Sequence, residues 1–234
     1  MEKIGLVTIT YNSADVISDF LESTFSQTFQ NFVIYIIDNN SQDDTLEILT
    51  EYTDSRIKLV KNKKNTGVAK ANNQGIELAL KDNCTQVLII NNDVEFEKQL
   101  FEKMLQIQKD KNCSLVVPKM MYFDNPDYIW YAGSTFIKKK GFLPIHKGIK
   151  QKDISQFDGV YLVEYAPTCC LLIKKEVFQD VGMMDEKYFV YFDDTDFSYR
   201  VLKDGRHKLF FFSDTKFYHK VGSLTKSLEK ENKR

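Results

Sequence analysis

The chain of 234 residues is long enough for one large domain or two small ones, and 43% of it is hydrophobic against 28% charged, as in globular proteins with a sizeable core. Its formal net charge of -1 gives no general attraction to nucleic acid or to anionic lipid. Basic residues gather only near the end, where residues 216–234 contain six lysines and arginines against two glutamates. We expect a solvated tail there, and a weak contact with a membrane surface is left open.

The N-terminus and the cysteines indicate an intracellular compartment. A strand pattern begins at Ile4, which leaves no room for a signal peptide, and no apolar run approaches the length of a transmembrane helix. The four cysteines show no C-x-x-C spacing, so reduced structural thiols are a better interpretation than a zinc site. We therefore expect a cytoplasmic protein, and peripheral contact with the inner face of the cell membrane is left open.

The first 96 residues alternate the patterns of strands and helices. Apolar strand patterns cover residues 4–9, 32–37, 57–60 and 87–90. Helical spacing of apolar residues follows each of the first three, with Ser13 a candidate N-cap of the first helix. Repeated β-α units with short connections predict an α/β fold with a doubly wound, mostly parallel central sheet.

Polar clusters follow all four of these strands. They are Thr10-Tyr11-Asn12, Asp38-Asn39-Asn40, residues 62–65 and Asn91-Asn92-Asp93. Because parallel strands end at the same edge of a sheet, these clusters predict a polar crevice in which a nucleotide would lie. A lone carboxylate beside two amides, as at Asp93, suits an oxygen-ligated divalent cation that bridges phosphates. The tripeptide alone would more simply be a turn that ends a strand.

The pattern changes beyond residue 96. A helical pattern leads to a short strand at residues 115–117, which Pro118 ends. Residues 120–165 are rich in aromatic residues, glycine and lysine, with only short strand-like pieces. We predict a smaller, mixed half of the same domain. The predicted division of this single domain is 1–96, 97–225 and a basic tail at 226–234.

Three carboxylates open a predicted helix in the second half. Asp193, Asp194 and Asp196 follow the aromatic run at residues 188–192. Acidic residues in a first turn are favoured by the helix dipole, so a capped helix is the simpler interpretation. A cap does not require three such residues, and a carboxylate at this place could act as a general base towards a hydroxyl group.

Taken in chain order, these segments resemble family 2 inverting glycosyltransferases with the GT-A fold, especially a bacterial rhamnosyltransferase-like branch. The matching stretches are residues 7–12, 37–43, 65–73, 91–93, 171–178, 192–196 and 219–223. Each stretch is weak alone, and their shared order over nearly the whole chain carries the resemblance. It implies a Rossmann-like nucleotide-sugar-binding half at 1–96 and a catalytic, acceptor-binding half at 97–225.

The resemblance implies a role in nucleotide-sugar binding for each matching residue of the first half. Asp38 would accept a hydrogen bond from the N3–H group of a uracil or thymine ring. Thr8, Tyr11 and Asn12 would lie around that base. The remaining residues implied to bind the nucleotide sugar, some of them on the floor near the ribose and diphosphate, are Asn40, Asn65, Gly67, Asn72, Asn91 and Asn92.

The resemblance also implies a metal, a base and an acceptor site. Asp93 and His219 would ligate Mn²⁺ or Mg²⁺, although a lone histidine after an aromatic strand is more often structural. Asp194 would be the catalytic base. The residues implied or suspected to contact the acceptor are Trp130, Gly133 and Asp193, of which Trp130 could equally be a core residue.

The sequence departs from the family pattern at three places. The first two positions of the family's DXD motif are amides, which leaves Asp93 as its single anionic ligand. The pair Asp193-Asp194 stands in place of Glu-Asp. Residues 168–170 are Thr-Cys-Cys where relatives often carry a small glycine or alanine.

We predict an inverting glycosyltransferase that transfers a sugar from a UDP- or dTDP-sugar, with dTDP-rhamnose among the candidates, to a saccharide or lipid-linked acceptor in bacterial surface polysaccharide synthesis. The alternative is a catalytically inactive nucleotide-sugar-binding module. A nucleotidyltransferase is less suitable, because no Gly-rich phosphate loop follows the first strand. No nucleic-acid partner is expected, and a homodimer is left open.

Overall fold

The computed structural model describes residues 1–222, so the predicted basic tail at 226–234 lies outside the described residues. The first half of the chain alternates strands and helices as the sequence predicts. Its elements are β1 (Ile4–Thr10), α1 (Ile17–Phe25), β2 (Phe32–Asp38), α2 (Thr45–Glu51), β3 (Ile57–Lys61), α3 (Val68–Lys81) and β4 (Gln86–Ile90).

The strands of this half are parallel. β1 pairs with both β2 and β4, and β2 pairs with β3. Every residue of β4 is buried, as a continuous apolar run is when helices cover both faces of a parallel sheet. The predicted α/β fold is therefore confirmed.

The second half contributes shorter strands and three helices. Its elements are β5 (Val94–Phe96), α4 (Leu100–Asp110), β6 (Leu115–Pro118), β7 (Met120–Tyr122), β8 (Ile129–Tyr131), β9 (Ser134–Ile137), the 3₁₀ turn η1 (Lys138–Lys140), β10 (Leu143–His146), β11 (Val160–Leu162), β12 (Cys170–Lys174), α5 (Lys175–Val181), α6 (Asp193–Asp204), β13 (Leu209–Phe212) and β14 (Phe217–His219).

Strands of the second half extend the sheet of the first. The eight strands of the main sheet lie in the order β11-β13-β6-β12-β4-β1-β2-β3, and β12 is antiparallel to both of its neighbours. The sheet is thus parallel up to β4 and mixed beyond it. A smaller sheet with the order β5-β14-β7-β8 and a two-stranded β9–β10 ribbon complete the half.

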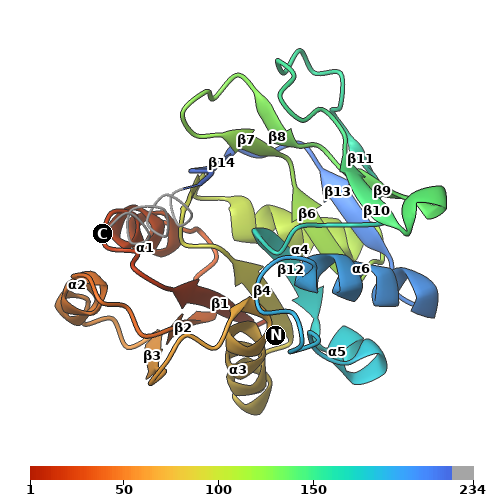
Figure 1. Cartoon of the computed structure of the whole chain (residues 1–234). Coiled ribbons are helices and arrows are strands. Elements are labelled where there is room, and N and C mark those ends of the chain that lie inside the picture. Colours follow the sequence, from red (N-terminus) through yellow and green to blue (C-terminus); the bar gives the residue numbers. More distant parts are fainter. Residues whose placement is uncertain (223–234) are drawn as a thin grey trace.

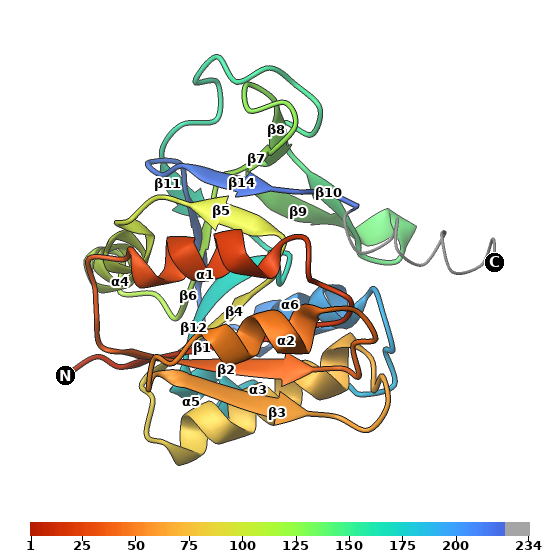
Figure 2. The ribbon, with the colours of Figure 1, turned by 90° about the vertical axis from the view of Figure 1, so that its left-hand side faces the viewer.

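Helices cover both faces of the main sheet. α3 and α5 lie on one face, and α1 and α4 lie on the other (Figure 1). Figure 2 shows β1, β2 and β3 ending on the same side of the molecule, which is where the polar clusters follow them. No helix within residues 1–222 is long and apolar enough to cross a bilayer.

The prediction that Ser13 caps the first helix was wrong. α1 begins at Ile17 after Val16, and no side chain caps it. The Ser13 hydroxyl accepts hydrogen bonds from the Tyr11 amide at 3.2 Å and from Asn92 Nδ2 at 3.0 Å. The hydroxyl therefore joins the loop after β1 to the loop after β4, a long-range contact that local sequence does not reveal.

Small residues let α3 pack directly against β1. A methyl group added at Gly75 would come within 2.3 Å of Val7 Cγ1, and one added at Gly5 would come within 2.4 Å of Ala79 Cβ. Real carbon atoms do not approach so closely, so a larger side chain must push the helix away. This contact sets the depth at which the N-terminus of α3 meets the polar edge of the sheet.

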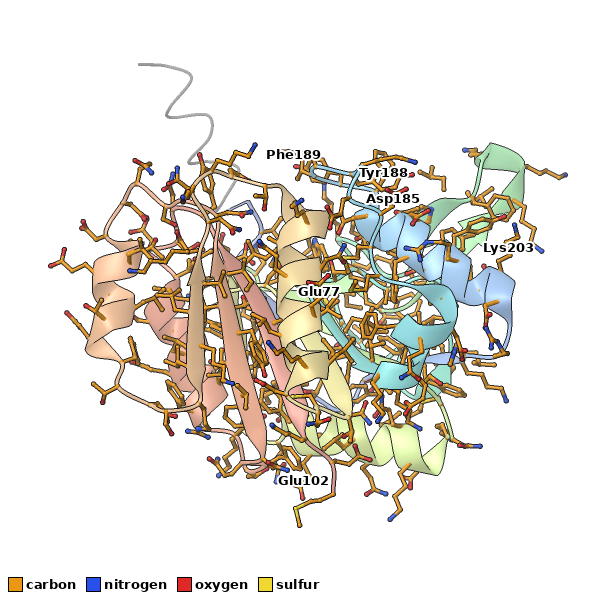
Figure 3. All side chains as sticks on the ribbon, turned by 90° about the horizontal axis from the view of Figure 1, so that it is seen from below. Glu77, Glu102, Asp185, Tyr188, Phe189 and Lys203 are labelled. Atoms are coloured by element: carbon orange, nitrogen blue, oxygen red, sulfur yellow. The ribbon has the colours of Figure 1, made fainter. Side chains whose placement is uncertain are left out.

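We expect the Gly75→Ala variant to be destabilised by about 1–3 kcal/mol, because the added methyl group overpacks the contact with Val7. Chemical denaturation followed by circular dichroism would measure the free energy of unfolding. Glu77→Ala is the matched control, since Glu77 is exposed on the same helix (Figure 3) and this change should alter stability by only a few tenths of a kcal/mol. Equal stability of the two variants would contradict the proposed packing.

Candidate active site

The ends of β1 and β2 are joined through the carboxylate of Asp38. Its Oδ1 accepts hydrogen bonds from Thr10 Oγ1 at 2.8 Å and Ser41 Oγ at 2.5 Å, and its Oδ2 accepts from the amides of Asn40 and Ser41 at 3.1 and 3.0 Å. The side chain is buried, and Asn40 takes a left-handed conformation with φ of 70°. Asp38 therefore fixes the turn after β2. Its contact with a base, and that of Asn40, stay predictions.

Asn39 is a central residue of this edge that the sequence analysis did not single out. Its Oδ1 accepts hydrogen bonds from Asn62 Nδ2 at 2.9 Å and Thr66 Oγ1 at 3.0 Å, and its Nδ2 donates to the Gly67 carbonyl at 3.2 Å. The side chain thus joins the ends of β2 and β3 to the start of α3. Nothing in the local sequence distinguishes it from the other amides of the loop.

The three residues predicted around the base lie at the end of β1 and in the loop after it. Thr8 is fully buried inside the strand, and Tyr11 is half-buried. Asn12 has φ of 53°, donates its amide to Ser41 Oγ at 3.0 Å and accepts at Oδ1 from the Gln42 amide at 2.8 Å. The loops after β1 and β2 therefore brace each other, and the contacts of Thr8, Tyr11 and Asn12 with a nucleotide stay predictions.

The start of α3 holds a segment from the second half of the chain. Asn65 Oδ1 accepts from the Gly67 amide at 2.9 Å, and Gly67 has φ of 83°. A Cβ at Gly67 would lie 2.6 Å from the Phe189 carbonyl oxygen, which itself accepts a hydrogen bond from the Val68 amide at 2.6 Å. The loop before α6 is thus seated on the turn predicted to line the diphosphate.

A second contact attaches the same segment farther along α3. Asn73 Nδ2 donates to the Met184 carbonyl at 2.9 Å, and the Met184 amide donates to Asn73 Oδ1 at 3.0 Å. The neighbouring Asn72 is buried with its Nδ2 at 3.6 Å from Met184 Sδ. Asn65, Gly67 and Asn72 therefore lie beside the loop that leads to Asp193 and Asp194, while their contacts with a nucleotide sugar stay predictions.

The two predicted metal ligands are neighbours. β5 is antiparallel to β14, and this pairing places His219 Nε2 3.4 Å from Asp93 Oδ1. Both side chains are more than nine-tenths buried. Burial by itself would lower the pKa of His219, but the adjacent Cys169 sulfur and Asp93 carboxylate outweigh it and raise that pKa to about 10. His219 Nδ1 has no hydrogen-bond partner among residues 1–222.

The residues at this place fit a divalent cation of the Mg²⁺ or Mn²⁺ type. They supply one carboxylate oxygen and one imidazole nitrogen, and within the described part of the chain no cluster of three or more histidine, cysteine or acidic side chains could enclose a metal. Such cations are commonly held by one or two protein ligands together with substrate phosphates and water. The pair Asp93 and His219 would therefore hold a cation that arrives with phosphate.

The two amides before Asp93 connect β4 to its neighbours. Asn92 Nδ2 donates to the Ile9 carbonyl at 2.7 Å, and the Asn91 amide donates to the Cys169 carbonyl at 3.0 Å. Asn92 is buried, so these contacts hold the end of β4 against β1 and β12. They also position Asp93. Direct contact of Asn91 and Asn92 with a nucleotide sugar stays a prediction.

α6 begins at Asp193, as the sequence predicts. Asp194 Oδ2 accepts a hydrogen bond from the Tyr165 hydroxyl at 2.7 Å, and its Oδ1 accepts from Thr195 Oγ1 at 3.2 Å. Asp194 is half-buried, whereas Asp193 is buried with no partner at Oδ2 among the described residues. Of the two carboxylates, Asp194 is therefore the one that a substrate can reach.

Both carboxylates have raised pKa values. Burial raises the pKa of Asp194, and the hydrogen bond from Tyr165 offsets part of that rise. Burial, and then repulsion by Asp194, raise the pKa of Asp193 to about 7. A carboxylate with a raised pKa is a stronger base, and a pair of carboxylates with raised pKa values is typical of sites that move a proton.

An aromatic wall connects the two ends of the site. The Trp130 ring lies 4.5 Å from the His219 ring and 5.5 Å from that of His146, and His146 stacks on Tyr165 at 5.5 Å. Tyr165 holds Asp194, so the wall leads from the Asp93–His219 pair to the carboxylates of α6. The sequence analysis assigned no role to Tyr165 or His146, because neither lies in a recognisable motif.

Gly133 lies behind this wall. It has φ of 88°, and a Cβ there would lie 3.0 Å from Val163 Cγ1. These two facts account for glycine at this position without an acceptor. Trp130 is half-buried against the core, and its ring lies on that of His219. This placement is compatible both with a core residue and with a residue that contacts the acceptor. The acceptor contacts of Trp130, Gly133 and Asp193 stay predictions.

Two relatives of the chain are named as sugar transferases. The chain is similar to the low-salt glycan biosynthesis hexosyltransferase Agl10 of Haloferax volcanii, with 24% identity over 87% of this chain and 63% of that protein. It is also similar to the dTDP-rhamnosyl transferase RfbF of Shigella flexneri, with 24% identity over 82% of this chain and 61% of that protein. The chain thus spans about three-fifths of the length of these relatives.

Solved structures share the fold at low identity. Staphylococcus aureus TarS aligns with a TM-score of 0.71 and 18% identity, over 95% of this chain and 37% of that one. GalNAc-T7, solved with UDP, GalNAc and Mn²⁺, aligns with a TM-score of 0.74 and 15% identity, over 94% of this chain and 44% of that one. These likenesses confirm the predicted GT-A fold.

The family assignment rests on a match along the sequence. The sequence model described as glycosyl transferase family 2 matches residues 6–182, which is most of the chain. The matched segment includes Asp38, the turn at Gly67 and Asp93, and it ends shortly before the start of α6. The chain belongs to glycosyl transferase family 2.

Proposed function

We propose that this protein is an inverting glycosyltransferase that uses a UDP- or dTDP-sugar and acts in bacterial surface polysaccharide synthesis. The observation that carries the proposal is the placement of two different acidic sites along one aromatic wall. Asp93 lies beside His219 at one end, and Asp194 is held by Tyr165 at the other. One end suits a diphosphate with a cation, and the other suits the removal of a proton from an acceptor.

The proposed reaction is a single in-line displacement. Asp194 takes the proton of an acceptor hydroxyl as that oxygen forms a bond to the anomeric carbon, and the bond from this carbon to the diphosphate oxygen breaks. Attack from the face opposite the nucleotide inverts the anomeric configuration. A divalent cation held by Asp93 and His219 would stabilise the negative charge on the leaving diphosphate.

The relatives support the substrate classes. RfbF is named a dTDP-rhamnosyl transferase, and GalNAc-T7 is solved with UDP and Mn²⁺. We therefore propose a UDP- or dTDP-sugar donor, including dTDP-rhamnose, with Mn²⁺ or Mg²⁺, and a saccharide or lipid-linked acceptor. We place the protein in the cytoplasm, where nucleotide sugars are made.

Nucleotide release from a panel of UDP-, dTDP- and GDP-sugars, with and without Mn²⁺ or Mg²⁺, tests the proposal. Slow metal-dependent hydrolysis of one donor is the expected result, and it would identify both nucleotide and sugar. Failure to bind any donor, with or without metal, would overturn the proposal. Donor binding with no turnover, even when acceptors are supplied, would favour the inactive nucleotide-sugar-binding module.

We expect Asp194→Asn to lower transfer by about 10²–10⁴-fold, because the base that accepts the acceptor proton is removed. Asp194→Asn should still bind the donor. In Asp93→Ala, donor binding should no longer depend on the metal. Asp196→Asn is the matched control on the same helix, since the Asp196 side chain pairs with Arg200 at 2.7 Å and not with Tyr165. Unchanged transfer in Asp194→Asn would exclude it as the base.

Tyr165→Phe should lower kcat by roughly 10–100-fold, because a hydrogen bond to a charged carboxylate is lost, and leave the KM of the donor unchanged. That hydrogen bond lowers the pKa of Asp194, so its removal raises this pKa. The acidic limb of the pH–rate profile should therefore move to higher pH. A loss of activity with an unmoved limb would assign Tyr165 a purely structural role.

Asp193→Asn should leave the acidic limb where it lies in the wild type. Burial and repulsion by Asp194 raise the pKa of Asp193 to about 7, so Asp193 takes up a proton first as the pH falls and Asp194 remains the charged base. Replacing Asp193 therefore removes a group that is already neutral when Asp194 begins to protonate. The test is kcat against pH for both proteins, and an acidic limb that moves in Asp193→Asn would contradict this order of protonation.

A further inference from the structure

Four consecutive apolar side chains are exposed immediately before α6. The exposed fractions are 55% for Phe189, 50% for Val190, 63% for Tyr191 and 60% for Phe192. A run of this length is unusual on the surface of a globular protein and indicates a surface that meets another apolar phase. We call residues 189–192 the aromatic loop.

The β9–β10 ribbon exposes apolar residues on its outer face. Its inner face is packed, with the Phe136 ring 6.1 Å from that of Tyr199 on α6. Along β10 the side chains alternate, so that Leu143 and Ile145 are 47% and 45% exposed on the other side. We call Leu143, Ile145 and Thr135, the exposed cross-strand neighbour of Ile145, the outer ribbon face.

The turn of this ribbon is strongly basic. Lys138, Lys139 and Lys140 form η1 and are all exposed, and none of them takes part in the ion pairs formed within residues 1–222. Residues 134–150 contain five lysines and no acidic residue, whereas the whole chain has a formal net charge of -1. The ribbon is therefore a local positive patch on a nearly neutral protein.

The aromatic loop and the ribbon lie at the same edge of the molecule, next to the candidate active site. Figure 3 shows Phe189 and the ribbon, coloured green, at the same edge of the molecule, and Figure 2 shows the loop before α6 and the ribbon on the side where β2 and β3 end. The inner end of β10 is His146, which stacks on Tyr165, and Tyr165 holds Asp194. A partner that binds the aromatic loop and the ribbon would therefore lie next to Asp194, the predicted base.

We propose that the aromatic loop, the outer ribbon face and the lysines of η1 dock onto an anionic lipid bilayer. Apolar side chains can enter the boundary between headgroups and acyl chains, while neighbouring lysines attract anionic headgroups. A second copy of the chain is a poorer occupant, because a two-fold contact would bring the lysine turn towards its own copy. This proposal deepens the proposed function. It rests on that function only in assuming that the acceptor is linked to a lipid.

Docking in this orientation would turn the edge of the molecule that carries Asp194 towards the membrane. An acceptor hydroxyl carried on a lipid would then reach Asp194 without the lipid leaving the bilayer.

Co-sedimentation of the full chain with vesicles tests the proposal. We expect binding to phosphatidylcholine vesicles that contain about one-third phosphatidylglycerol, and much weaker binding to phosphatidylcholine alone or at high salt. The variant Lys138→Glu/Lys139→Glu/Lys140→Glu should bind roughly 100-fold more weakly or worse, since each lysine near the surface contributes about fivefold. Leu143→Ser/Ile145→Ser should weaken binding by about tenfold through its apolar contacts.

The matched control is Lys109→Glu/Lys111→Glu/Lys208→Glu, which makes the same change of charge before β6 and β13 at the opposite edge of the sheet. This control variant should bind the vesicles as well as the wild type does. The proposal is overturned if the wild-type chain does not bind, if the ribbon variant binds as well as the wild type, or if the control loses as much. Vesicle-free dimers that dissociate in Leu143→Ser/Ile145→Ser would assign the surface to a second copy instead.

Donor hydrolysis without vesicles separates this inference from the proposed function. The η1 lysine variant should hydrolyse the donor in solution at the wild-type rate, because its three substitutions lie outside the candidate active site. Patch-dependent vesicle binding by a chain that turns over no donor would overturn the proposed function and leave the docking surface in place. Donor turnover with no vesicle binding would overturn the docking surface and leave the proposed function in place.

Discussion

The place of Asp194 depends on the reciprocal hydrogen bonds between Asn73 and Met184. These bonds attach a segment of the second half of the chain to the middle of α3, and the Val68 amide attaches the same segment again at Phe189. α3 in turn is seated against β1 through Gly75. The base is therefore positioned relative to the ends of the parallel strands by one helix that contacts both halves.

The candidate site concentrates ionisable groups where water is largely excluded. Burial opposes charge on Asp193, Asp194 and His219 alike, but their neighbours differ. The neighbouring Cys169 and Asp93 raise the pKa of His219 to about 10, whereas burial and repulsion by Asp194 raise the pKa of Asp193 to about 7. Binding a cation at Asp93 would release the His219 proton, because an imidazole ligates a metal only in its neutral form.

The segment before α6 combines unfavourable features that packing compensates. Tyr191 and Phe192 both have φ of 65°, a left-handed conformation that costs about 1–2 kcal/mol for each such residue. Their side chains are also exposed. The hydrogen bond from the Val68 amide to the Phe189 carbonyl and that from the Asp196 amide to the Phe192 carbonyl hold the loop in place. A bilayer would bury the apolar surface that the chain itself leaves uncovered.

The sequence by itself determined the alternation of strands and helices, the polar edge after each parallel strand and the start of α6 at Asp193, because periodicity, turn residues and acidic first turns act over a few neighbouring positions. It also placed the chain in its family through motifs such as the one ending in Asp93. Only the tertiary structure decided that Ser13 bonds Asn92 in place of capping α1, that Tyr165 holds Asp194, and that Asn39 joins three elements. Each of these contacts pairs residues at least 23 positions apart, and an isolated serine, tyrosine or asparagine gives no local sign of a partner that folding brings beside it.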